Sequence, residues 1–347
     1  MGQIVRSYVN NFEFIDRTPQ LLIIPNQWDI INQLNIFPAV EGVMSNTVSL
    51  EQIIDTTAIM VDRVRGERNN YSKDSVRKLY SFPIPHFPLD DALTPADIQG
   101  KTAYGTNDME EQVSLAVARK LSRIRRSHAM FMEIARAKLL EDGTVYAPNG
   151  TVSVNYYTEF GISRKEIDFA FGTSTSDILG KGEEGIAHIY DNILNGTTSI
   201  SGFVAICHPT FFANLIKHPT TKTAYQYYTS VGAQEPLRQR LSSALPRGTR
   251  MFDYGGITYV EYRGLKPDGT PFVPAGEARL VPTEAFDIFG SYAAPAQKMD
   301  LVNTVGMEAY VFEYRDPKGN GIEFESESNL LHVARRPAVI VRLYSSN

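Results

Sequence analysis

The chain has 347 residues, of which 43% are hydrophobic and 21% charged, so it is long enough for two domains and too apolar for a disordered protein. Its net charge of −5 argues against a dedicated nucleic-acid-binding protein, which usually carries a basic excess. The single cysteine, Cys207, excludes an internal disulfide and fits a reducing compartment. We expect no secretory signal in residues 1–16 and no membrane partner, because no apolar run approaches the roughly 20 residues of a membrane span.

The first hundred residues lack the periodicity of a packed domain. Residues 1–45 are interpreted as an arm, because nothing in them repeats regularly enough to close a core. Residues 46–98 contain strand-like runs at 47–54, 57–64 and 76–83. A charged, turn-rich tip lies at 65–70, and the proline-rich segment 82–88 returns the chain in extended form. An isolated hairpin is marginal in water, so we expect this excursion to dock on another surface.

The segment 107–142 contains no glycine and no proline, and its apolar residues recur at helical spacing. Asn107 and Glu110 match a capping box, and Gly143 is a natural stop. A helix of this length measures roughly 50 Å, whereas a compact chain of this size has a radius of gyration of about 20 Å. We therefore predict a helix that crosses the whole molecule, in a subunit that completes its core against neighbours.

The rest of the chain predicts a mixed region followed by a β-rich end. A hairpin with an Asn149-Gly150 turn follows the long helix, and the Gly/Ser/Thr-rich run 172–185 predicts a flexible junction. Helices are expected at 186–194 and 209–217, and strands at 203–207, 256–262, 279–281 and 286–289. Further strands are expected at 307–314, 322–325 and 338–344.

Motifs for catalysis, metal binding or cofactor binding are weak throughout the chain. Four residues match positions of a calcium-binding loop: Asp316, Asn320, Gly321 and Glu327. Lys318 stands where that loop needs an oxygen ligand, and strand-like flanks favour a hairpin turn. The pair Cys207-His208 follows an apolar run, which favours a buried structural cysteine. The sequence therefore predicts no catalytic residue, no cofactor and no metal site.

A basic run lies within the predicted long helix: Arg119, Lys120, Arg123, Arg125 and Arg126. On a helix these side chains spread over more than one face. Interleaved aromatic residues, which nucleic-acid-binding surfaces usually add, are absent from the run. The pattern favours a solvated or subunit-facing stripe, and weak contact with nucleic acid stays open.

Four stretches of the chain, by their order and spacing, resemble the major capsid protein E family of tailed bacteriophages, the lambda-type shell subunit. They are 61–68 with 80–86 and 93–98, then 123–132 with 135–146, then 254–262 with 272–274, and finally 313–318 with 325–328 and 335–337. The likeness extends over the chain from about residue 45 onward.

The resemblance implies an α+β fold, the tailed-phage major capsid fold. The implied parts are an N-terminal arm (1–45), an extended loop and its return (46–98), a peripheral domain (99–179) with spine helix 107–142, an axial domain (180–296) and C-terminal strands of the peripheral domain (297–347). The extended loop would lie over an adjacent subunit, and its charged residues are the expected contacts: Arg63, Arg65, Glu67 and Arg68.

The implied function is structural and not enzymatic. Copies would form pentamers and hexamers of an icosahedral capsid around double-stranded DNA, assembled in the cytoplasm of a host bacterium. The implied partners are other copies, a separate scaffolding protein, a portal, a cement or decoration protein, and packaged DNA through weak non-specific contact. The alternatives are an encapsulin-like nanocompartment shell of the same fold, an unrelated intracellular enzyme that uses 180–296, and a DNA-binding module that uses the basic helix.

Overall fold

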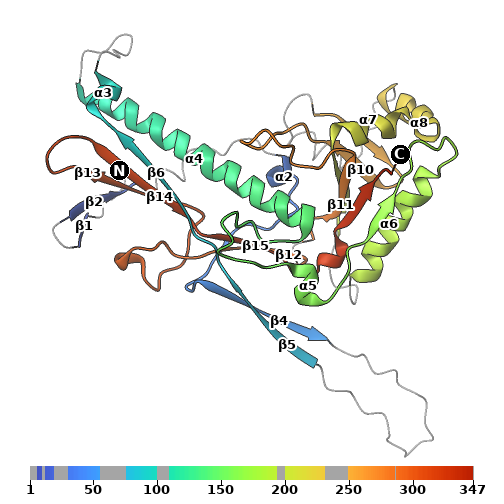
Figure 1. Cartoon of the computed structure of the whole chain (residues 1–347), viewed down its shortest axis with the longest axis horizontal. Coiled ribbons are helices and arrows are strands. Elements are labelled where there is room, and N and C mark those ends of the chain that lie inside the picture. Colours follow the sequence, from blue (N-terminus) through green and yellow to red (C-terminus); the bar gives the residue numbers. More distant parts are fainter. Residues whose placement is uncertain are drawn as a thin grey trace, which may run out of the picture.

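The computed structural model describes most of the chain, in the segments 6–9, 12–18, 30–54, 76–99, 109–193, 200–230, 249–285 and 287–346. Within these segments the strands form sheets of five, six, three and two strands. Figure 1 shows the five-stranded and six-stranded sheets near opposite ends of one long helix, α4 (Met109–Asp142).

Helix α4 confirms the long helix predicted from the segment without glycine or proline. Its 34 residues span about 51 Å at 1.5 Å per residue. Gly143 follows it with a φ of 67°, a left-handed conformation in which other side chains are strained. The predicted cap, Asn107, lies outside the described residues.

The two halves of α4 belong to different hydrophobic cores. The first half packs against the five-stranded sheet with Val117, Leu121 and Ile124. The second half enters the main core, which includes the six-stranded sheet, with Ala137, Leu139 and Leu140. Because one continuous helix contributes to both cores, it fixes the two sheets relative to each other.

The five-stranded sheet is antiparallel and has the order β1–β2–β13–β14–β6. Its strands are β1 (Arg6–Val9), β2 (Phe12–Asp16), β13 (Tyr310–Arg315), β14 (Ile322–Ser328) and β6 (Phe87–Leu93), and α3 (Pro95–Ile98) follows β6. Strand β6 overlaps the proline-rich return, for which the sequence predicts only extended chain. It includes Pro88 because it lies at the edge of the sheet, where a strand can lack one backbone donor.

Part of the segment 1–45, interpreted from the sequence as an arm, packs against the rest of the subunit. Strand β2 pairs with β13, and helix α2 (Ile30–Gln33) packs against α4. The side chains that this segment buries in the main core include Ile31, Leu34, Ile36 and Phe37. Periodicity did not predict this burial, because a four-residue helix and the coil after it are too short to show a repeat.

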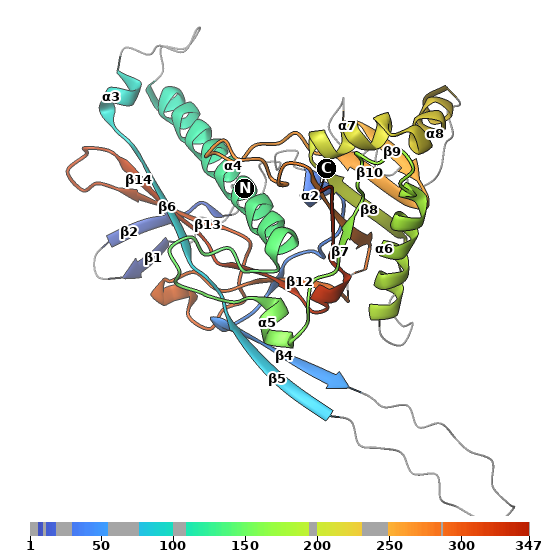
Figure 2. The same ribbon diagram turned by 45° about the vertical axis from the view of Figure 1, so that its right-hand side comes forward.

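The six-stranded sheet has the order β7–β16–β11–β8–β10–β9. Its strands are β7 (Glu166–Asp168), β16 (Val341–Tyr344), β11 (Glu277–Thr283), β8 (Gly202–Cys207), β10 (Ile257–Glu261) and β9 (Met251–Tyr254). Helices α6 (Ile178–Asn192), α7 (Pro209–Lys217) and α8 (Pro219–Ser230) surround it (Figure 2). Strand β16 belongs to 297–347, which the resemblance assigns to the peripheral domain, and it pairs with β11 and β7.

A three-stranded sheet lies between these two units. It consists of β15 (Leu330–Ala334), β12 (Phe289–Ala293) and β3 (Glu41–Gly42). Strand β12 pairs antiparallel with β15 and parallel with β3. Strand β15, which the sequence pattern did not predict, also packs against α4.

The later part of the Gly/Ser/Thr-rich run 172–185 is not a flexible junction, because Gly180, Gly182 and Gly185 lie in α6. Gly182 and Gly185 are buried where the helix meets the sheet. A Cβ atom on Gly185 would lie 2.7 Å from a methyl carbon of Leu280, and one on Gly182 would lie 3.3 Å from a methyl carbon of Ile257. The glycines therefore allow close packing of helix on sheet, and this tertiary contact outweighs their low helix propensity.

The remaining sheet is a ribbon of β4 (Thr47–Ile54) and β5 (Val76–Pro83), paired in register from Thr47–Pro83 to Ile54–Val76. Both strands confirm the predicted runs, and the run expected at 57–64 lies outside the described residues. The hairpin expected after α4 closes through the single bridge between Thr144 and Asn155, and then α5 (Tyr156–Phe160) begins. Among the described helices, none combines the length and the apolar character that crossing a membrane requires.

Candidate assembly surfaces

The β4–β5 ribbon is anchored firmly at its base. Val48 and Phe82 are buried there in the main core. The ring of Phe82 packs edge-on against Tyr156, with ring centroids 5.3 Å apart, and Tyr80 packs edge-on against Phe160 at 4.8 Å. Aromatic pairs at these separations stabilise a contact beyond the area that they bury. Helix α5 thus holds the ribbon where it leaves the body.

Beyond its base the ribbon is exposed. It projects away from the rest of the molecule in both views (Figures 1 and 2). Leu79 is 73% exposed, and the Arg77–Glu51 cross-strand ion pair, at 3.4 Å, is exposed as well. Within the described residues the ribbon pairs with no other sheet, so both of its edges keep unpaired backbone groups. Open edges beside an exposed leucine are typical of a strand pair that contacts another chain.

The charged residues expected to contact a neighbouring subunit lie between β4 and β5 in the sequence. Arg63, Arg65, Glu67 and Arg68 are outside the described residues. The structure therefore describes the exposed part of the β4–β5 ribbon, here called the stem. The contacts of the four charged residues stay a prediction.

Glu133 anchors the N-terminal segment to the middle of α4. Its carboxylate is fully buried and accepts hydrogen bonds from the backbone N–H groups of Ile31 and Asn32, at 2.8 and 3.0 Å. The hydroxyl of Tyr262 donates to the same carboxylate at 2.7 Å. A buried charge is tolerated only with such partners, so Glu133 joins α4 to both α2 and the residue after β10.

Arg136, one turn after Glu133, adds to this anchor. It donates to the side-chain oxygen of Asn32 at 2.8 Å and lies over the ring of Phe37 at 5.2 Å. Burial lowers the pKa of Arg136 to about 10, and the nearby Glu133 partly opposes that shift. Neither residue was predicted from the sequence, although charged side chains at core positions of a helix were a usable signal.

Further polar contacts join α4 to β14 and to Glu308, just before β13. The guanidinium of Arg125 lies 3.3 Å from the carboxylate of Glu308, and the ring of His128 is hydrogen-bonded to the hydroxyl of Ser326 at 3.1 Å. Burial, and secondarily the charge of Arg125, lower the pKa of His128 to about 4. The histidine is therefore neutral near pH 7, as a structural contact requires.

The residues considered for chemistry have structural roles. The thiol of Cys207 is buried and donates to the carbonyl of Ala205 at 3.3 Å, and burial raises its pKa. His208 instead accepts from the backbone N–H of Thr210 and caps α7. The Cys207 thiol and the His208 ring do not form a nucleophile and its base.

The sequence 316–321 is the turn between β13 and β14, as its strand-like flanks predict. The carboxylate of Asp316 accepts from the backbone N–H groups of Lys318 and Asn320, at 3.0 and 3.3 Å. Glu327 lies at the far end of β14, opposite Tyr310, and does not join them. In the described part of the chain, no three His, Cys, Asp or Glu side chains are grouped as metal ligands.

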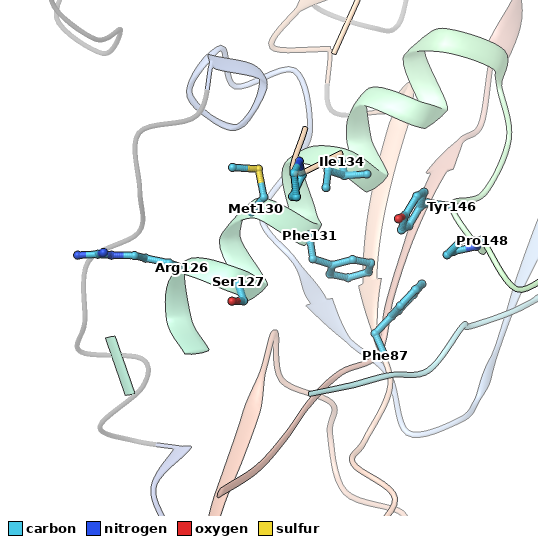
Figure 3. Close-up of a pocket in the computed structure, with 9 residues that line it drawn as sticks. Phe87, Arg126, Ser127, Met130, Phe131, Ile134, Tyr146 and Pro148 are labelled. Atoms are coloured by element: carbon cyan, nitrogen blue, oxygen red, sulfur yellow. The ribbon is translucent and has the colours of Figure 1, made fainter. Parts of the chain in front are cut away.

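Two further surface features remain on the body. The loop 299–305 exposes Met299, Val302 and Val305, and it is tied to the chain beside β3 by a hydrogen bond from the Gly306 N–H to the Val43 carbonyl. An open apolar groove of about 420 Å³ lies along the middle of α4. Figure 3 shows the rings of Phe87, Phe131 and Tyr146 around it, with Arg126 pointing away from them.

Comparison with known proteins identifies this arrangement. A family model described as phage major capsid protein E matches residues 18–345. The chain is 41% identical over 351 residues to the major capsid protein of Pseudomonas phage KPP10, a match that covers 97% of this chain and 98% of the relative. It is 28% identical over 368 residues to the major capsid protein of Salmonella phage Felix O1, covering 97% of each.

Solved structures share the fold at low sequence identity. The mature capsid of bacteriophage PhiM1 matches with a TM-score of 0.52 and 11% identity, over 100% of this chain and 91% of that chain. The capsid of Myoviridae phage XM1 matches with a TM-score of 0.51 and 11% identity, over 92% of each chain. These matches confirm a mixed α/β capsid architecture. Because the family model spans almost the whole sequence, the chain belongs to the phage major capsid protein E family and is a structural, non-enzymatic protein of the phage capsid.

Proposed function

We propose that copies of this chain assemble as pentamers and hexamers into an icosahedral shell that encloses double-stranded DNA. The β4–β5 ribbon is the observation that supports this most directly. Its base is buried in the main core, and its stem is exposed with open edges. A two-stranded ribbon is marginal in water, so a neighbouring copy supplies the surface that stabilises it.

The parts of the chain then have the roles that the family resemblance implies. Residues 1–45 are the N-terminal arm, and 46–98 form the extended loop that lies over an adjacent subunit. Residues 99–179, with helix α4, and the C-terminal strands of 297–347 form the peripheral domain. Residues 180–296, with α6, α7 and α8, form the axial domain, which meets its copies at five-fold and six-fold positions.

Avidity provides the driving force for such a shell. A contact between unlike surfaces of two copies closes into a ring when the rotation between copies permits it. Each subunit then makes several contacts at once, and permanent interfaces of this kind bury about 2,000–5,000 Å². The ribbon and the exposed apolar loop 299–305 are surfaces for these contacts.

Assembly in this proposal needs partners besides other copies. A separate scaffolding protein would template the shell, a portal would occupy one vertex, and a cement or decoration protein could cover the outside. The packaged DNA would contact the shell only weakly, since a net charge of −5 per chain disfavours strong adhesion.

Substitution at the loop tip tests the proposal. A variant with Arg65, Glu67 and Arg68 replaced by alanine should stay soluble and yield far fewer closed particles in negative stain, because the contacts over the neighbour are lost. Leu79→Ser, which changes the described stem, should act in the same direction. A control with Glu183, Lys217 and Lys222 replaced by alanine changes exposed charges on the axial helices. Closed particles at wild-type yield from both ribbon variants would refute the role of the ribbon.

The particle contents separate the capsid from a nanocompartment. Purified particles from infected cells should contain double-stranded DNA, which nuclease digestion after particle opening would reveal. An enzyme cargo without DNA would instead identify a nanocompartment shell.

A further inference from the structure

Three arginines of α4 form an exposed ridge. Arg119, Arg123 and Arg126 are exposed and follow one another at spacings of four and three residues, which places them on one face of the helix. The ridge is about 10 Å long at 1.5 Å per residue. Ser127, next to its end, is also exposed.

The other two basic residues of the same run are accounted for by contacts within the subunit. Lys120 pairs with Asp91 at 2.7 Å, and the buried Arg125 pairs with Glu308 at 3.3 Å. In the described part of the chain, no carboxylate forms an ion pair with the ridge arginines. Like charges four residues apart on a helix repel one another, so the ridge does not contribute to the stability of the free subunit.

The chemistry of the ridge fits a phosphate backbone. Arginine is the side chain best suited to paired contacts with phosphate oxygens. The helix surface along one side of the ridge carries the small side chains Ala118 and Ser122, which leave the guanidinium groups open to a broad rod. An acidic peptide would also need apolar anchors along the ridge, whereas in the described part of α4 the exposed apolar surface lies at the two ends of the ridge, at Leu115 one turn before Arg119 and in the groove that Arg126 borders. The ridge therefore favours a nucleic acid over a protein segment.

We propose that Arg119, Arg123 and Arg126 contact the phosphates of the packaged double-stranded DNA, and that this face of α4 points into the shell. The inference rests on the proposed function, because it needs a shell that holds DNA. A contact of this kind is weak in one subunit and is multiplied by the many copies of a shell. Because each subunit needs only a weak contact with DNA, a local basic ridge is compatible with a chain whose net charge is −5.

Salt-dependent binding by the free subunit tests the contact. The probe is a fluorescent DNA duplex of about 30 base pairs, and the readout is anisotropy between about 50 and 200 mM salt. Three phosphate contacts predict a slope of roughly −2.7 in log affinity against log salt concentration. Replacing the three arginines by glutamine should weaken binding at least about tenfold at the lowest salt and abolish most of the slope.

A matched control separates local contact from net charge. Lys217, Lys222 and Lys318 are exposed on α7, α8 and the β13–β14 turn, and their replacement by glutamine changes the net charge equally. This control should keep the wild-type slope. Equal losses in both variants, or no loss in the ridge variant, would overturn the proposal.

Thiol labelling of assembled shells tests the direction of the ridge. Cys207 is the only cysteine in the sequence and is buried, so Arg123→Cys introduces one reactive thiol. A bulky maleimide should label that thiol in free subunits and leave it unlabelled in closed, empty particles. Labelling of closed particles would overturn the inward direction.

Particle formation distinguishes this inference from the function on which it rests. Closed particles should form at wild-type yield from the ridge variant. If the wild-type protein forms no particles when it is produced together with its scaffolding protein, the shell itself is refuted. If only the ridge variant fails to form particles and its DNA binding is unchanged, the ridge contacts protein and the DNA proposal is wrong.

Discussion

At the scale of single residues, charged groups buried along α4 decide how the body is held together. Glu133 connects α4 to α2 and to Tyr262, the residue after β10. His128 connects the same helix to β14, and Arg125 connects it to Glu308, just before β13. None of these contacts could be predicted from the sequence, because a helical repeat shows which positions are buried and not which distant donor meets them. They make the subunit sensitive to substitution and to pH.

Removing the carboxylate of Glu133 should be strongly destabilising. Glu133→Ala leaves two backbone N–H groups and a tyrosine hydroxyl without their acceptor, and we expect the free energy of unfolding to fall by about 3 kcal/mol or more. Urea unfolding of the isolated subunit measures the change. Glu183→Ala, at an exposed position of α6, is the control and should change stability by less than about 0.5 kcal/mol. A Glu133→Ala variant as stable as this control would contradict the anchoring role.

His128 should make the subunit less stable in mild acid. Its pKa is lowered from 6.5 to about 4, so below pH 6.5 the unfolded chain binds a proton that the folded chain does not. Stability is therefore lost as the pH falls from 6.5 towards 4, by about 2 kcal/mol from this group at pH about 5. His128→Gln, which keeps a group near Ser326, should remove that part of the pH dependence in urea unfolding. His332, whose pKa is also lowered by burial, contributes in the same direction and should do so equally in both proteins.

At the scale of elements, local sequence patterns predicted several helices and strands. The placement of the others depends on tertiary packing and pairing. The run without glycine or proline predicted α4, the β-rich runs predicted β4 and β5, and the pattern of 209–217 predicted α7. The glycines of α6 led to a wrong prediction of a junction, because they allow the helix to pack closely on β10 and β11 and do not form a turn. The placement of β16 beside β11 and β7 depends on long-range pairing, which a single strand pattern does not contain.

The end of α4 offers a test of local geometry. Gly143 and Gly161 have nearly the same φ, 67° and 66°. A Cβ atom on Gly143 would lie 2.4 Å from the ring of Tyr157, whereas one on Gly161 meets nothing within 4 Å. Gly161→Ala should therefore cost only the strain of the left-handed backbone, about 1 kcal/mol. Gly143→Ala should cost clearly more in thermal unfolding, and equal costs would show that the end of α4 tolerates displacement of Tyr157.

At the scale of the whole molecule, helix α4 joins two hydrophobic cores, and the β4–β5 ribbon projects from the body, to which only its base is anchored. The family was predictable from the order of its motifs, and the comparisons confirm it. The contact residues of the loop were predicted only through the resemblance, because a single chain contains no record of the surface that its neighbour presents. The proposed function completes the ribbon and the apolar loop 299–305 of each subunit with other copies.

Electron cryomicroscopy of purified particles tests this central claim most directly. We predict closed shells in which the β4–β5 stem of each subunit, with Leu79, is covered by an adjacent subunit. A shell whose stem stays exposed to solvent, or a ribbon folded back on its own subunit, would contradict it.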